Sequence, residues 1–460
     1  MSYRIDFSKP DKIHFIGIGG ISMSGLAEIL LGAGFTVSGS DRAASDLTRK
    51  LESEGCTIYC GQRSENIKDD TGIVVYTAAI KEDNPELAAA ISKGIPTMTR
   101  AELLGQIMKN YETSIAVSGT HGKTTTTSML TSILLDAETD PTVSVGGMLP
   151  SIGGNIRIGK SGFFVTEACE YTNSFLSFFP TISIILNIDA DHLDFFKDID
   201  DIRSSFKKFA DLLPENGLLV INSDIDRYEE ITKDVKCRVV TVSAEGKADY
   251  TAHSVEYDDK GCASFEVVRD GSTLTDVSLA VPGAHNVSNA LAAIAVCDHL
   301  KIGAGHIKNG IGSYTGTDRR FQYKGKIGGV TVIDDYAHHP TEIAATLSAA
   351  KNVPHKKLWL VFQPHTYSRT KALFDEFAKA LSAADEVVLA DIYAARENDD
   401  LGISSKDLCE AIKSYGTLSG YFGSFDEIEN FLLQKCSPGD LLITMGAGDI
   451  VKVADDLVGS

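Results

Sequence analysis

A glycine-rich loop followed by a lysine and threonines carries the clearest chemical signal in the sequence. Residues 116–127 read AVSGTHGKTTTT, so that an apolar run leads directly into Gly-Lys-Thr. The usual triphosphate-binding loop has a glycine five positions before the Gly-Lys, but that position is Val117 here. Gly119 is the nearest substitute, which makes this loop two residues shorter than the usual one. The segment therefore indicates a compact phosphate-binding loop.

Phosphate binding requires particular neighbours on both sides of such a loop. A strand must deliver the chain to the turn, and a helix must begin at the lysine so that its free N–H groups face phosphate oxygens. The run SIAVSG fits the strand, and TTTTSMLTSILLDA fits the helix. Lys123 is then expected to reach the β- and γ-phosphates, and the Thr124 hydroxyl to hold Mg²⁺. A turn with an exposed lysine and no ligand is the less favoured alternative.

The predicted ATP site includes the whole loop and the start of the helix. His121 belongs to this set, although a loop residue that merely tolerates the turn is the other interpretation of it. The residues are Gly119, Thr120, His121, Gly122, Lys123, Thr124 and Thr125.

Two polar residues that end predicted strands are candidate metal ligands. Ligands of an open parallel sheet lie beyond the carboxyl ends of its strands. Glu167 follows the apolar run GFFVT, and His192 closes the run TISIILNIDADH. Mg²⁺ prefers oxygen ligands, so Glu167 fits such a site better than His192 does. Either residue could instead be an ordinary polar strand end, but a sheet edge shared with Lys123 favours the metal site.

A second nucleotide-type loop lies near the start of the chain. GIGGIS, residues 17–22, stands between a predicted strand and a predicted helix, as a dinucleotide-binding loop does. Its third glycine is replaced by Ser22, and Asp41 follows about twenty residues on, where a carboxylate often binds a ribose. These residues fit a nucleotide diphosphate as well as NAD, and a tight turn without a ligand stays an alternative. Two nucleotide loops in one chain favour phosphoryl activation of a nucleotide-linked substrate over hydride transfer.

Three segments with alternating strands and helices must position these loops. The first runs to about residue 107, the second from about 108 to 317, and the third from about 318 to 460. In each segment short apolar runs alternate with helical spacing, which predicts parallel sheets covered by helices. Between about 237 and 281 polar and apolar residues alternate around Gly and Asp turns, which predicts an antiparallel insertion or edge. The sequence therefore predicts an α/β fold with three domains in series, 1–107, 108–317 and 318–460.

The composition limits the partners and the compartment. The 460 residues carry 63 acidic and 43 basic side chains, a net charge of −20, which repels nucleic acid and anionic membranes. No apolar run is long enough to span a bilayer, and the first residues lack the apolar core of a signal peptide. The eight cysteines are scattered without a Cys-x-x-Cys pair. We therefore expect a cytoplasmic monomer or homodimer with reduced thiols, no nucleic-acid partner and no membrane insertion.

Motifs spread from one end of the chain to the other resemble those of the Mur ligases, which build the peptide of peptidoglycan precursors. They are GIGGISMSGLAE, SGSD, GTHGKTTTT, NIDADHLD, GAHNVSNALAA, RRFQ, DDYAHHPTEI, QPHTYSRT and TMGAGDI. GTHGKT is the shortened loop that this family uses. The resemblance implies a Rossmann-like UDP-sugar domain, a central P-loop ATPase domain with a mostly parallel sheet, and a Rossmann-like C-terminal domain for the amino acid.

The resemblance also assigns individual residues to ligands. The UDP-sugar site comprises Gly17, Gly19, Gly20, Ser22 and Asp41. The MgATP site combines Lys123 with the metal ligands Thr124, Glu167 and His192, with Asn286 and Asn289 at the adenine, Asp335 at the ribose and Arg320 at the phosphates. The incoming amino acid is placed near Tyr336, His338 and Arg369.

The implied reaction is ATP-dependent ligation of L-alanine to the lactyl carboxylate of UDP-N-acetylmuramate through an acyl phosphate. Lys123 and Arg320 are the expected charge-neutralising residues. His338 is a candidate base with His339 as its rival, or it only orients the amino acid. One alternative is a recycling ligase that adds a whole tripeptide. Alternatives of a different class are an NAD-dependent dehydrogenase and a nucleotide-switched binding protein.

Some positions depart from the pattern of the family. Cys169 and Tyr171 stand where many members read EADES, and Thr366 stands where an arginine is common, although Arg369 is kept. Some Mur ligases carry a carbamylated lysine in the region of Lys207, but the alanine-adding branch generally lacks it. None is therefore assigned.

Overall fold

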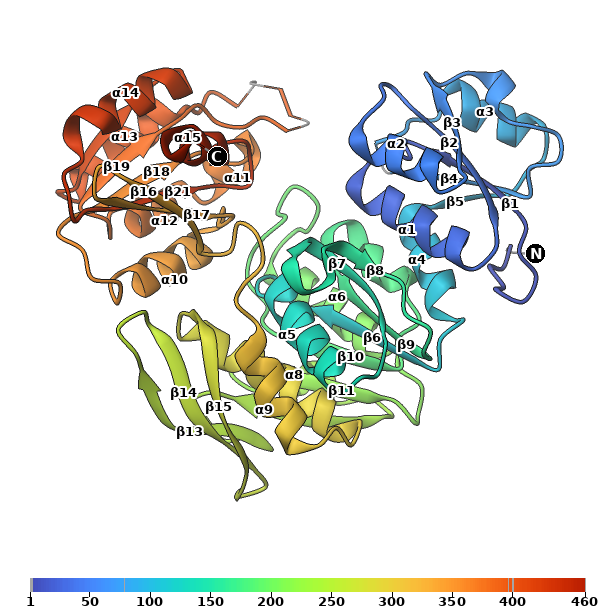
Figure 1. The fold of residues 1–460 in the computed structure, drawn as a ribbon, viewed down its shortest axis with the longest axis horizontal. Coiled ribbons are helices and arrows are strands. Elements are labelled where there is room, and N and C mark those ends of the chain that lie inside the picture. The colour runs from blue at the N-terminus through green and yellow to red at the C-terminus, as the bar shows by residue number, and fades with distance from the viewer. Residues whose placement is uncertain (1–2, 78, 396, 399–400, 460) are drawn as a thin grey trace.

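The computed structural model describes residues 3–77, 79–395, 397–398 and 401–459. These residues form three α/β domains in series, each built on one mostly parallel β-sheet, which confirms the predicted fold class (Figure 1). In this view the blue N-terminal domain and the orange to red C-terminal domain stand on either side, above the green and yellow central domain. No helix in the described ranges is long and apolar enough to cross a membrane.

The N-terminal domain is a five-stranded parallel sheet in the order β3-β2-β1-β4-β5. Its strands are β1 Lys12–Ile16, β2 Thr36–Asp41, β3 Thr57–Cys60, β4 Ile73–Tyr76 and β5 Thr97–Thr99. Its helices are α1 Ile21–Gly32, α2 Asp46–Ser53, α3 Pro85–Ser92 and α4 Arg100–Met108. The buried central strand β1 leads into the glycine loop 17–20, so this loop lies at the carboxyl edge of the sheet.

The central domain is a ten-stranded sheet in the order β15-β14-β13-β12-β11-β10-β6-β9-β7-β8. Its strands are β6 Thr113–Ser118, β7 Thr142–Leu149, β8 Gly154–Arg157, β9 Phe163–Ala168, β10 Ile182–Ile185, β11 Leu218–Asn222, β12 Arg238–Ser243, β13 Tyr250–Tyr257, β14 Cys262–Arg269 and β15 Ser272–Pro282. Its helices are α5 Lys123–Asp136, α6 Ile199–Ala210, α7 Tyr228–Thr232, α8 His285–His299 and α9 Ala304–Ser313.

The prediction of an antiparallel segment from about 237 onwards is wrong for its first part. β12 pairs in parallel with β11, and β13 pairs in parallel with β12, so the parallel sheet continues further than expected. Only β14 and β15 add antiparallel strands at that edge. The alternation of polar and apolar residues indicates strands with one buried face, and such strands occur in both parallel and antiparallel pairing.

The C-terminal domain has a six-stranded sheet in the order β16-β17-β21-β18-β19-β20. Its strands are β16 Gln322–Ile327, β17 Val330–Asp335, β18 Leu358–Phe362, β19 Glu386–Leu389, β20 Leu418–Tyr421 and β21 Leu441–Met445. Its helices are α10 Pro340–Ala350, α11 Tyr367–Ala372, α12 Phe374–Leu381, α13 Ser405–Ser414, α14 Phe425–Lys435 and α15 Val451–Val458. The edge strand β16 pairs antiparallel to β17, so the predicted parallel pattern is wrong for this strand.

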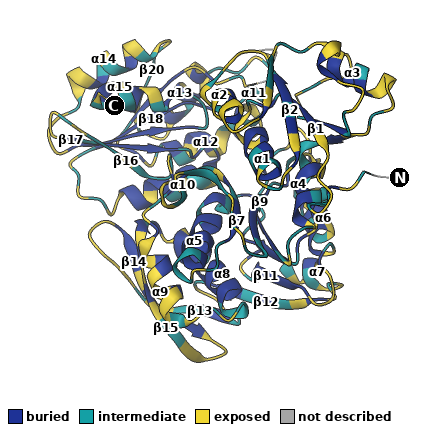
Figure 2. Ribbon diagram, turned by 45° about the vertical axis from the view of Figure 1, so that its right-hand side comes forward, coloured by how far each residue is buried: buried dark blue, intermediate teal, exposed yellow. Residues whose placement is uncertain are grey.

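The hydrophobic cores are distributed unevenly over the three domains. The N-terminal domain has two apolar clusters, and the larger one continues through Leu103 and Ile107 of α4 to Phe164 of the central sheet. The other face of the central sheet has its own cluster, and two clusters cover the two faces of the C-terminal sheet. Figure 2 shows the buried residues along the strands of each sheet and the exposed ones on outer loops and helix faces. The N-terminal and central domains therefore share a core, whereas the C-terminal domain keeps its own.

Candidate active site

The phosphate loop runs from the end of β6 to Lys123, which begins α5 as the sequence predicted. Gly122 has a left-handed backbone with φ of 82°, and a Cβ there would lie 2.6 Å from Asn289 Oδ1. Gly119 has φ of 140°, and a Cβ there would lie 2.9 Å from Leu186 Cβ. Both positions therefore require glycine. No side chain caps α5, so its first N–H groups are left for an anion.

The Lys123 ammonium turns back onto its own loop. It donates to the carbonyl oxygens of Gly119 at 2.5 Å and Thr120 at 3.0 Å, and it lies 3.2 Å from Glu170 Oε2. Burial alone would lower the pKa of this ammonium, but the charge and hydrogen bond of Glu170, together with Cys169 and Glu167, raise it above its ordinary value. Lys123 therefore stays cationic in a buried place. Sequence reasoning missed Glu170, and its signal was a second glutamate in EACE after the buried strand β9.

The predicted metal ligands lie around this lysine. Glu167 Oε1 accepts a hydrogen bond of 2.6 Å from the backbone N–H of Gly146. His192 Nε2 lies 3.9 Å from Glu170 Oε1, a buried oxygen that has no hydrogen-bond partner. In the described part of the chain, no three His, Cys, Asp or Glu side chains are grouped so that they could hold a metal ion. The donors still fit Mg²⁺, which keeps several waters and binds through one or two carboxylates together with phosphates.

An aromatic ring holds His192 in place. The Tyr171 ring lies against the imidazole with 4.5 Å between centroids, and the Tyr171 hydroxyl donates to Asp194 at 2.8 Å. Burial lowers the pKa of His192, and the neighbouring Asp191 and Glu170 raise it only in part. The imidazole is therefore neutral at pH 7, as a metal ligand must be. Tyr171, one of the departures from the family pattern, thus has a structural role here.

A cleft of about 720 Å³ opens between the three domains and contains most of the predicted phosphate and metal residues. Ile21 of α1 contributes from the N-terminal domain. The predicted site residues in its lining are Thr120, His121, Gly122, Lys123, Thr124, Glu167, His192, Arg320, Tyr336 and His338. The structure thus brings together residues from segments nearly two hundred positions apart, and the arrangement suits transfer of a phosphoryl group between bound substrates.

A second cavity, of about 250 Å³, lies beside the phosphate loop, between the central and C-terminal domains. Asn286 and Asn289 of α8 line it, and Asn289 Nδ2 donates to Asn286 Oδ1 at 3.0 Å. Asp335 lies on the opposite wall and accepts the N–H groups of Phe321 and Ala337, each at 2.7 Å. Burial raises the pKa of Asp335 to about 6. The predicted adenine and ribose residues therefore share one cavity beside the phosphate loop.

Arg320 lies in the connection between these two domains and lines both cavities. Its neighbours Arg319 and Phe321 have left-handed backbones with φ of 61° and 50°, which is uncommon for residues other than glycine. The Arg320 guanidinium stands over the Tyr336 ring at 5.2 Å. Burial lowers the pKa of Arg320, but the carboxylates of Glu342 and Asp335 raise it overall. The turn therefore delivers a permanent positive charge to the boundary between the cavities.

His338 stands at the end of the cleft that belongs to the C-terminal domain. Its Nδ1 lies 3.0 Å from the carbonyl oxygen of Tyr336. A carbonyl oxygen only accepts hydrogen bonds, so Nδ1 carries the proton and Nε2 keeps its lone pair. Burial lowers the pKa of His338 to about 4, against the opposing charge of Glu342. His338 is therefore neutral at pH 7 and can accept a hydrogen bond or a proton.

Arg369 lies apart from Tyr336 and His338, in a smaller cavity of about 100 Å³ that Thr366 also lines. Its Nε donates to Asp191 Oδ1 at 3.0 Å across the domain junction. Burial raises the pKa of Asp191, but the charge of Arg369 together with the neighbouring histidines lowers it below its ordinary value. The structure therefore divides the three predicted amino-acid residues between two neighbouring cavities.

The second nucleotide-type loop has the strand–turn–helix geometry expected from the sequence. Gly17 has φ of 83° and donates from its N–H to the carbonyl oxygen of Ser40 at 2.8 Å. The N–H of Gly19 donates to Asp41 Oδ2 at 2.8 Å, so this carboxylate holds the loop from the end of β2. Gly20 precedes α1, and no side chain caps that helix.

Ser22, in the first turn of α1, has a basic partner that the sequence did not reveal. Its hydroxyl accepts a hydrogen bond of 3.1 Å from Nη1 of Arg100, the first residue of α4. Burial lowers the pKa of this guanidinium. Because Arg100 follows the last strand of the sheet by one residue, its position after β5 was the signal that could have found it.

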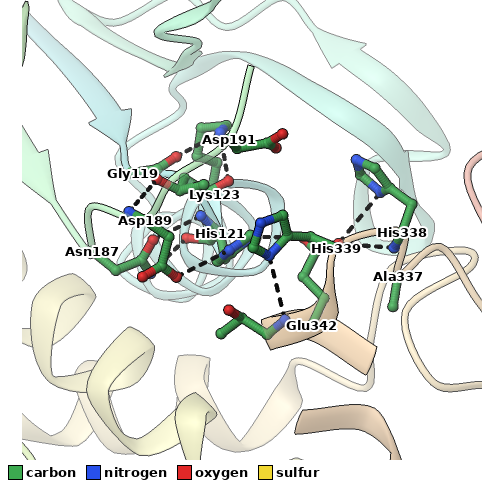
Figure 3. A network of polar contacts seen from close by, with 12 residues as sticks. Gly119, His121, Lys123, Asn187, Asp189, Asp191, Ala337, His338, His339 and Glu342 are labelled. Carbon is green, nitrogen blue, oxygen red and sulfur yellow. Dashed lines mark hydrogen bonds and ion pairs between the residues drawn. The ribbon is translucent and has the colours of Figure 1, made fainter. Parts of the chain in front are cut away.

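His121 connects the phosphate loop to the C-terminal domain (Figure 3). Its Nδ1 lies 3.0 Å from Glu342 Oε1, and its Nε2 lies 3.1 Å from Asp189 Oδ2. Burial would lower the pKa of His121, but these two carboxylates raise it to about 9. The neighbouring His339 also crosses the junction, since its Nε2 donates to the carbonyl oxygen of Ala190 at 3.1 Å. His121 is therefore an imidazolium at pH 7.

Comparison with protein families covers nearly the whole chain. Residues 12–112 match the model of the Mur ligase family, catalytic domain. Residues 117–297 match the Mur ligase middle domain, and residues 319–448 match the Mur ligase, glutamate ligase domain. The three matches follow one another as the three sheets do.

Individual relatives extend over the full length. The UDP-N-acetylmuramate–L-alanine ligase of Agathobacter rectalis is 61% identical over 456 residues, which is 99% of each chain. The protein of the same name from Lachnospira eligens is 59% identical over 457 residues, which is 99% of this chain and 100% of that one. Among solved structures, the UDP-N-acetylmuramate–alanine ligase of Thermotoga maritima is 32% identical with a TM-score of 0.80, covering 98% of both chains. A murein peptide ligase from Psychrobacter arcticus is 25% identical with a TM-score of 0.71, again covering 98% of both.

Proposed function

This chain belongs to the Mur ligase family, and we propose that it joins L-alanine to the lactyl carboxylate of UDP-N-acetylmuramate at the expense of ATP. The observation that carries this proposal is the full-length identity of 61% to a ligase of that name. The murein peptide ligase, which represents the tripeptide-adding alternative, is less similar in both sequence and structure than the alanine ligase of Thermotoga maritima. An NAD-dependent dehydrogenase would leave the phosphate loop without a use.

The phosphate loop and its surroundings would hold ATP. The N–H groups of the loop and of α5 face its β- and γ-phosphates, and Asn286 and Asn289 bind the adenine. Mg²⁺, held by Thr124, Glu167 and His192, would neutralise phosphate charge. The Lys123 ammonium exchanges its carbonyl partners for phosphate oxygens when the nucleotide enters.

The reaction needs an activated acid, because a carboxylate does not react with an amine at neutral pH. An oxygen of the lactyl carboxylate attacks the γ-phosphorus, the bond to the β-phosphate oxygen breaks, and an acyl phosphate and ADP form. The amine of L-alanine then attacks the carbonyl carbon, and the tetrahedral intermediate releases phosphate and leaves an amide. Lys123 and Arg320 neutralise the charge that spreads over the transferred phosphoryl oxygens.

The amino acid would lie at the C-terminal end of the cleft. The amine must lose a proton to attack, and the free lone pair on His338 Nε2 can accept it or orient the amine. The Arg369 guanidinium suits the alanine carboxylate, because it can donate two parallel hydrogen bonds. Asp191 accepts from Nε of Arg369, and His365 contacts Nη1, so the amino acid binds the remaining donors or displaces one of these partners.

The UDP-sugar would occupy the N-terminal domain. Its diphosphate fits over Gly17, Gly19 and Gly20 at the uncapped start of α1, with Ser22 and Arg100 beside it. Asp41 would bind the nucleoside. The cytoplasmic location and a monomeric or homodimeric state stay predictions.

A single assay tests the function. Phosphate release from ATP is measured with UDP-N-acetylmuramate, with and without L-alanine, and the amide product is identified by mass spectrometry. We expect release that requires both substrates. Release that requires neither would favour a nucleotide-switched binding protein, and a change in nicotinamide absorbance would favour a dehydrogenase. Glycine, L-serine and the recycling tripeptide compete in parallel reactions, and preference for the tripeptide would replace the alanine assignment.

A further inference from the structure

Glu342 lies where the phosphate loop of the central domain meets the amino-acid end of the cleft. It belongs to the first turn of α10, whose N-cap is His339. Its carboxylate is only 13% exposed and contacts residues of two domains (Figure 3). The side chain stands between the phosphate site and the proposed amine site, and it reaches toward both.

The two carboxylate oxygens have different partners. Oε1 lies 3.0 Å from Nδ1 of His121 in the phosphate loop. Oε2 accepts a hydrogen bond of 3.0 Å from the backbone N–H of His338, and it lies 3.3 Å from Nδ1 of the same residue. One rigid group therefore fixes the distance between the loop and His338.

His121 is itself held firmly on the side of the central domain. Its backbone N–H donates to Asn187 Oδ1 at 2.7 Å, and its carbonyl oxygen accepts from Asn187 Nδ2 at 3.0 Å. Its second ring nitrogen lies 3.1 Å from Asp189 Oδ2, so the imidazole stands between two carboxylates. Their negative charges favour the charged form of the ring. Glu342 thus binds a cation whose place is set by the phosphate loop.

We propose that Glu342 is a positioning residue that couples the phosphate loop to the amino-acid site, by binding His121 with one oxygen and His338 with the other. The inference rests on the proposed ligase function. The contact crosses the domain junction, so it exists only while the C-terminal domain is closed on the loop. Without this contact, the phosphate loop and the amino-acid site each stay intact, but they are misplaced relative to one another.

A double-mutant cycle tests this coupling through the rate of amide formation. Because a misplacement of about 1 Å costs about 100-fold in rate, Glu342→Gln should lower kcat/KM for L-alanine by about 100-fold. His121→Gln, which breaks only the end of the bridge at the loop, should lower it by about 10-fold. The double variant should lie within about twofold of Glu342→Gln, because both changes break the same bridge. The affinity of Glu342→Gln for a fluorescent ATP analogue should change by less than about threefold.

Glu427→Gln is the matched control. Glu427 occupies the same position in the first turn of α14, three residues after the N-cap Ser424, and faces solvent. It should keep wild-type kinetics. Thermal melting of all variants identifies any loss of folding, and His121→Gln tests the bridge from the other domain if Glu342→Gln is unstable.

Several outcomes would overturn the coupling. One is a wild-type kcat/KM for L-alanine in Glu342→Gln. Another is a double variant whose kcat/KM falls by about 1000-fold, because the two effects then multiply and are independent. A third is a loss of ATP-analogue affinity in Glu342→Gln as large as its loss of kcat/KM. For His121→Gln alone, an unchanged kcat/KM for L-alanine counts against it. If the wild-type protein forms no amide from L-alanine, the proposed function fails first, so the two failures are distinguishable.

Discussion

The two junctions between the domains of this protein differ in their chemistry. At the first junction, between the N-terminal and central domains, apolar groups and backbone pack closely. A Cβ on Gly25 of α1 would lie 2.3 Å from Ile156 Cγ1 of β8, and a Cβ on Gly105 of α4 would lie 1.9 Å from the carbonyl oxygen of Ser177. At the second junction, between the central and C-terminal domains, the contacts are ion pairs and hydrogen bonds of Glu342, Arg369 and His339.

This difference in chemistry indicates which of the two junctions opens more easily. Apolar area removed from water stabilises by roughly 25 cal/mol per Å², and opening an apolar junction loses that term without replacement. A hydrogen bond exchanges with water and contributes only about 0.5–1.5 kcal/mol net. We therefore expect the C-terminal domain to open and close around the substrates, and the N-terminal domain to keep its place. Closure would also exclude the water that hydrolyses an acyl phosphate.

The largest expected effect is that of a change at Lys123, which should affect the proposed ATP site but not the proposed UDP-sugar site across the apolar junction. Lys123→Ala should lower turnover by more than about 1000-fold, because it removes a preorganised charge from the transferred phosphoryl group. UDP-N-acetylmuramate affinity, measured by calorimetry, should stay within about twofold, since its proposed binding loop lies in the other domain. Lys326→Ala, at an exposed position of β16, is the control. Full activity of Lys123→Ala would remove the assignment of the loop.

A smaller effect is expected at the polar junction. Arg369→Ala should raise the KM for L-alanine by about 100-fold, because it removes the proposed bidentate partner of the carboxylate and frees Asp191. Arg369→Lys should recover only part of this, because an ammonium cannot form the planar pair. Initial rates over a range of L-alanine concentrations measure both. An unchanged KM would place the carboxylate elsewhere.

The apolar junction can be tested by stability rather than activity. Gly25→Ala should destabilise the protein by about 1–3 kcal/mol, because the added methyl group meets Ile156 across the junction. Gly305→Ala in α9 has no atom within 4 Å of the new methyl group, and should stabilise by up to about 1 kcal/mol. Urea unfolding of both variants gives the comparison. A Gly25→Ala protein as stable as Gly305→Ala would show that the first junction is loosely packed.

The smallest expected effect is a response to salt. At 1 M salt the Debye length falls to about 3 Å, which weakens the ion pairs of the second junction only a little, because they are mostly buried. The radius of gyration of the ligand-free protein, measured by X-ray scattering, should therefore rise slightly. A Glu342→Gln protein should already show the larger radius at low salt and respond less. Identical profiles for both proteins at all salt concentrations would contradict a polar junction that opens.

The sequence predicted the strands, turns and helix starts of the site better than the pairing of strands and the contacts between distant residues. The strand, the glycine turn and the start of α5 at Lys123 follow from neighbouring residues, since helix starts and left-handed glycines are local properties. The direction of β12 was predicted wrongly, because alternation reports one buried face and contains no information about which strand lies beside it. Glu170 was missed because only the packing of β9 beside β6 brings it to Lys123.

The sequence by itself determined the chemical groups and the local frames that present them: two glycine loops at strand ends, a lysine at a helix start, and the motifs of one ligase family. Only the tertiary structure decided that Arg369 lies in a different cavity from His338, and that Glu342 joins His338 to a loop more than two hundred residues away. The physical reason is one of range. Backbone preferences act over a few residues, whereas the distance between two sheets depends on every side chain packed between them.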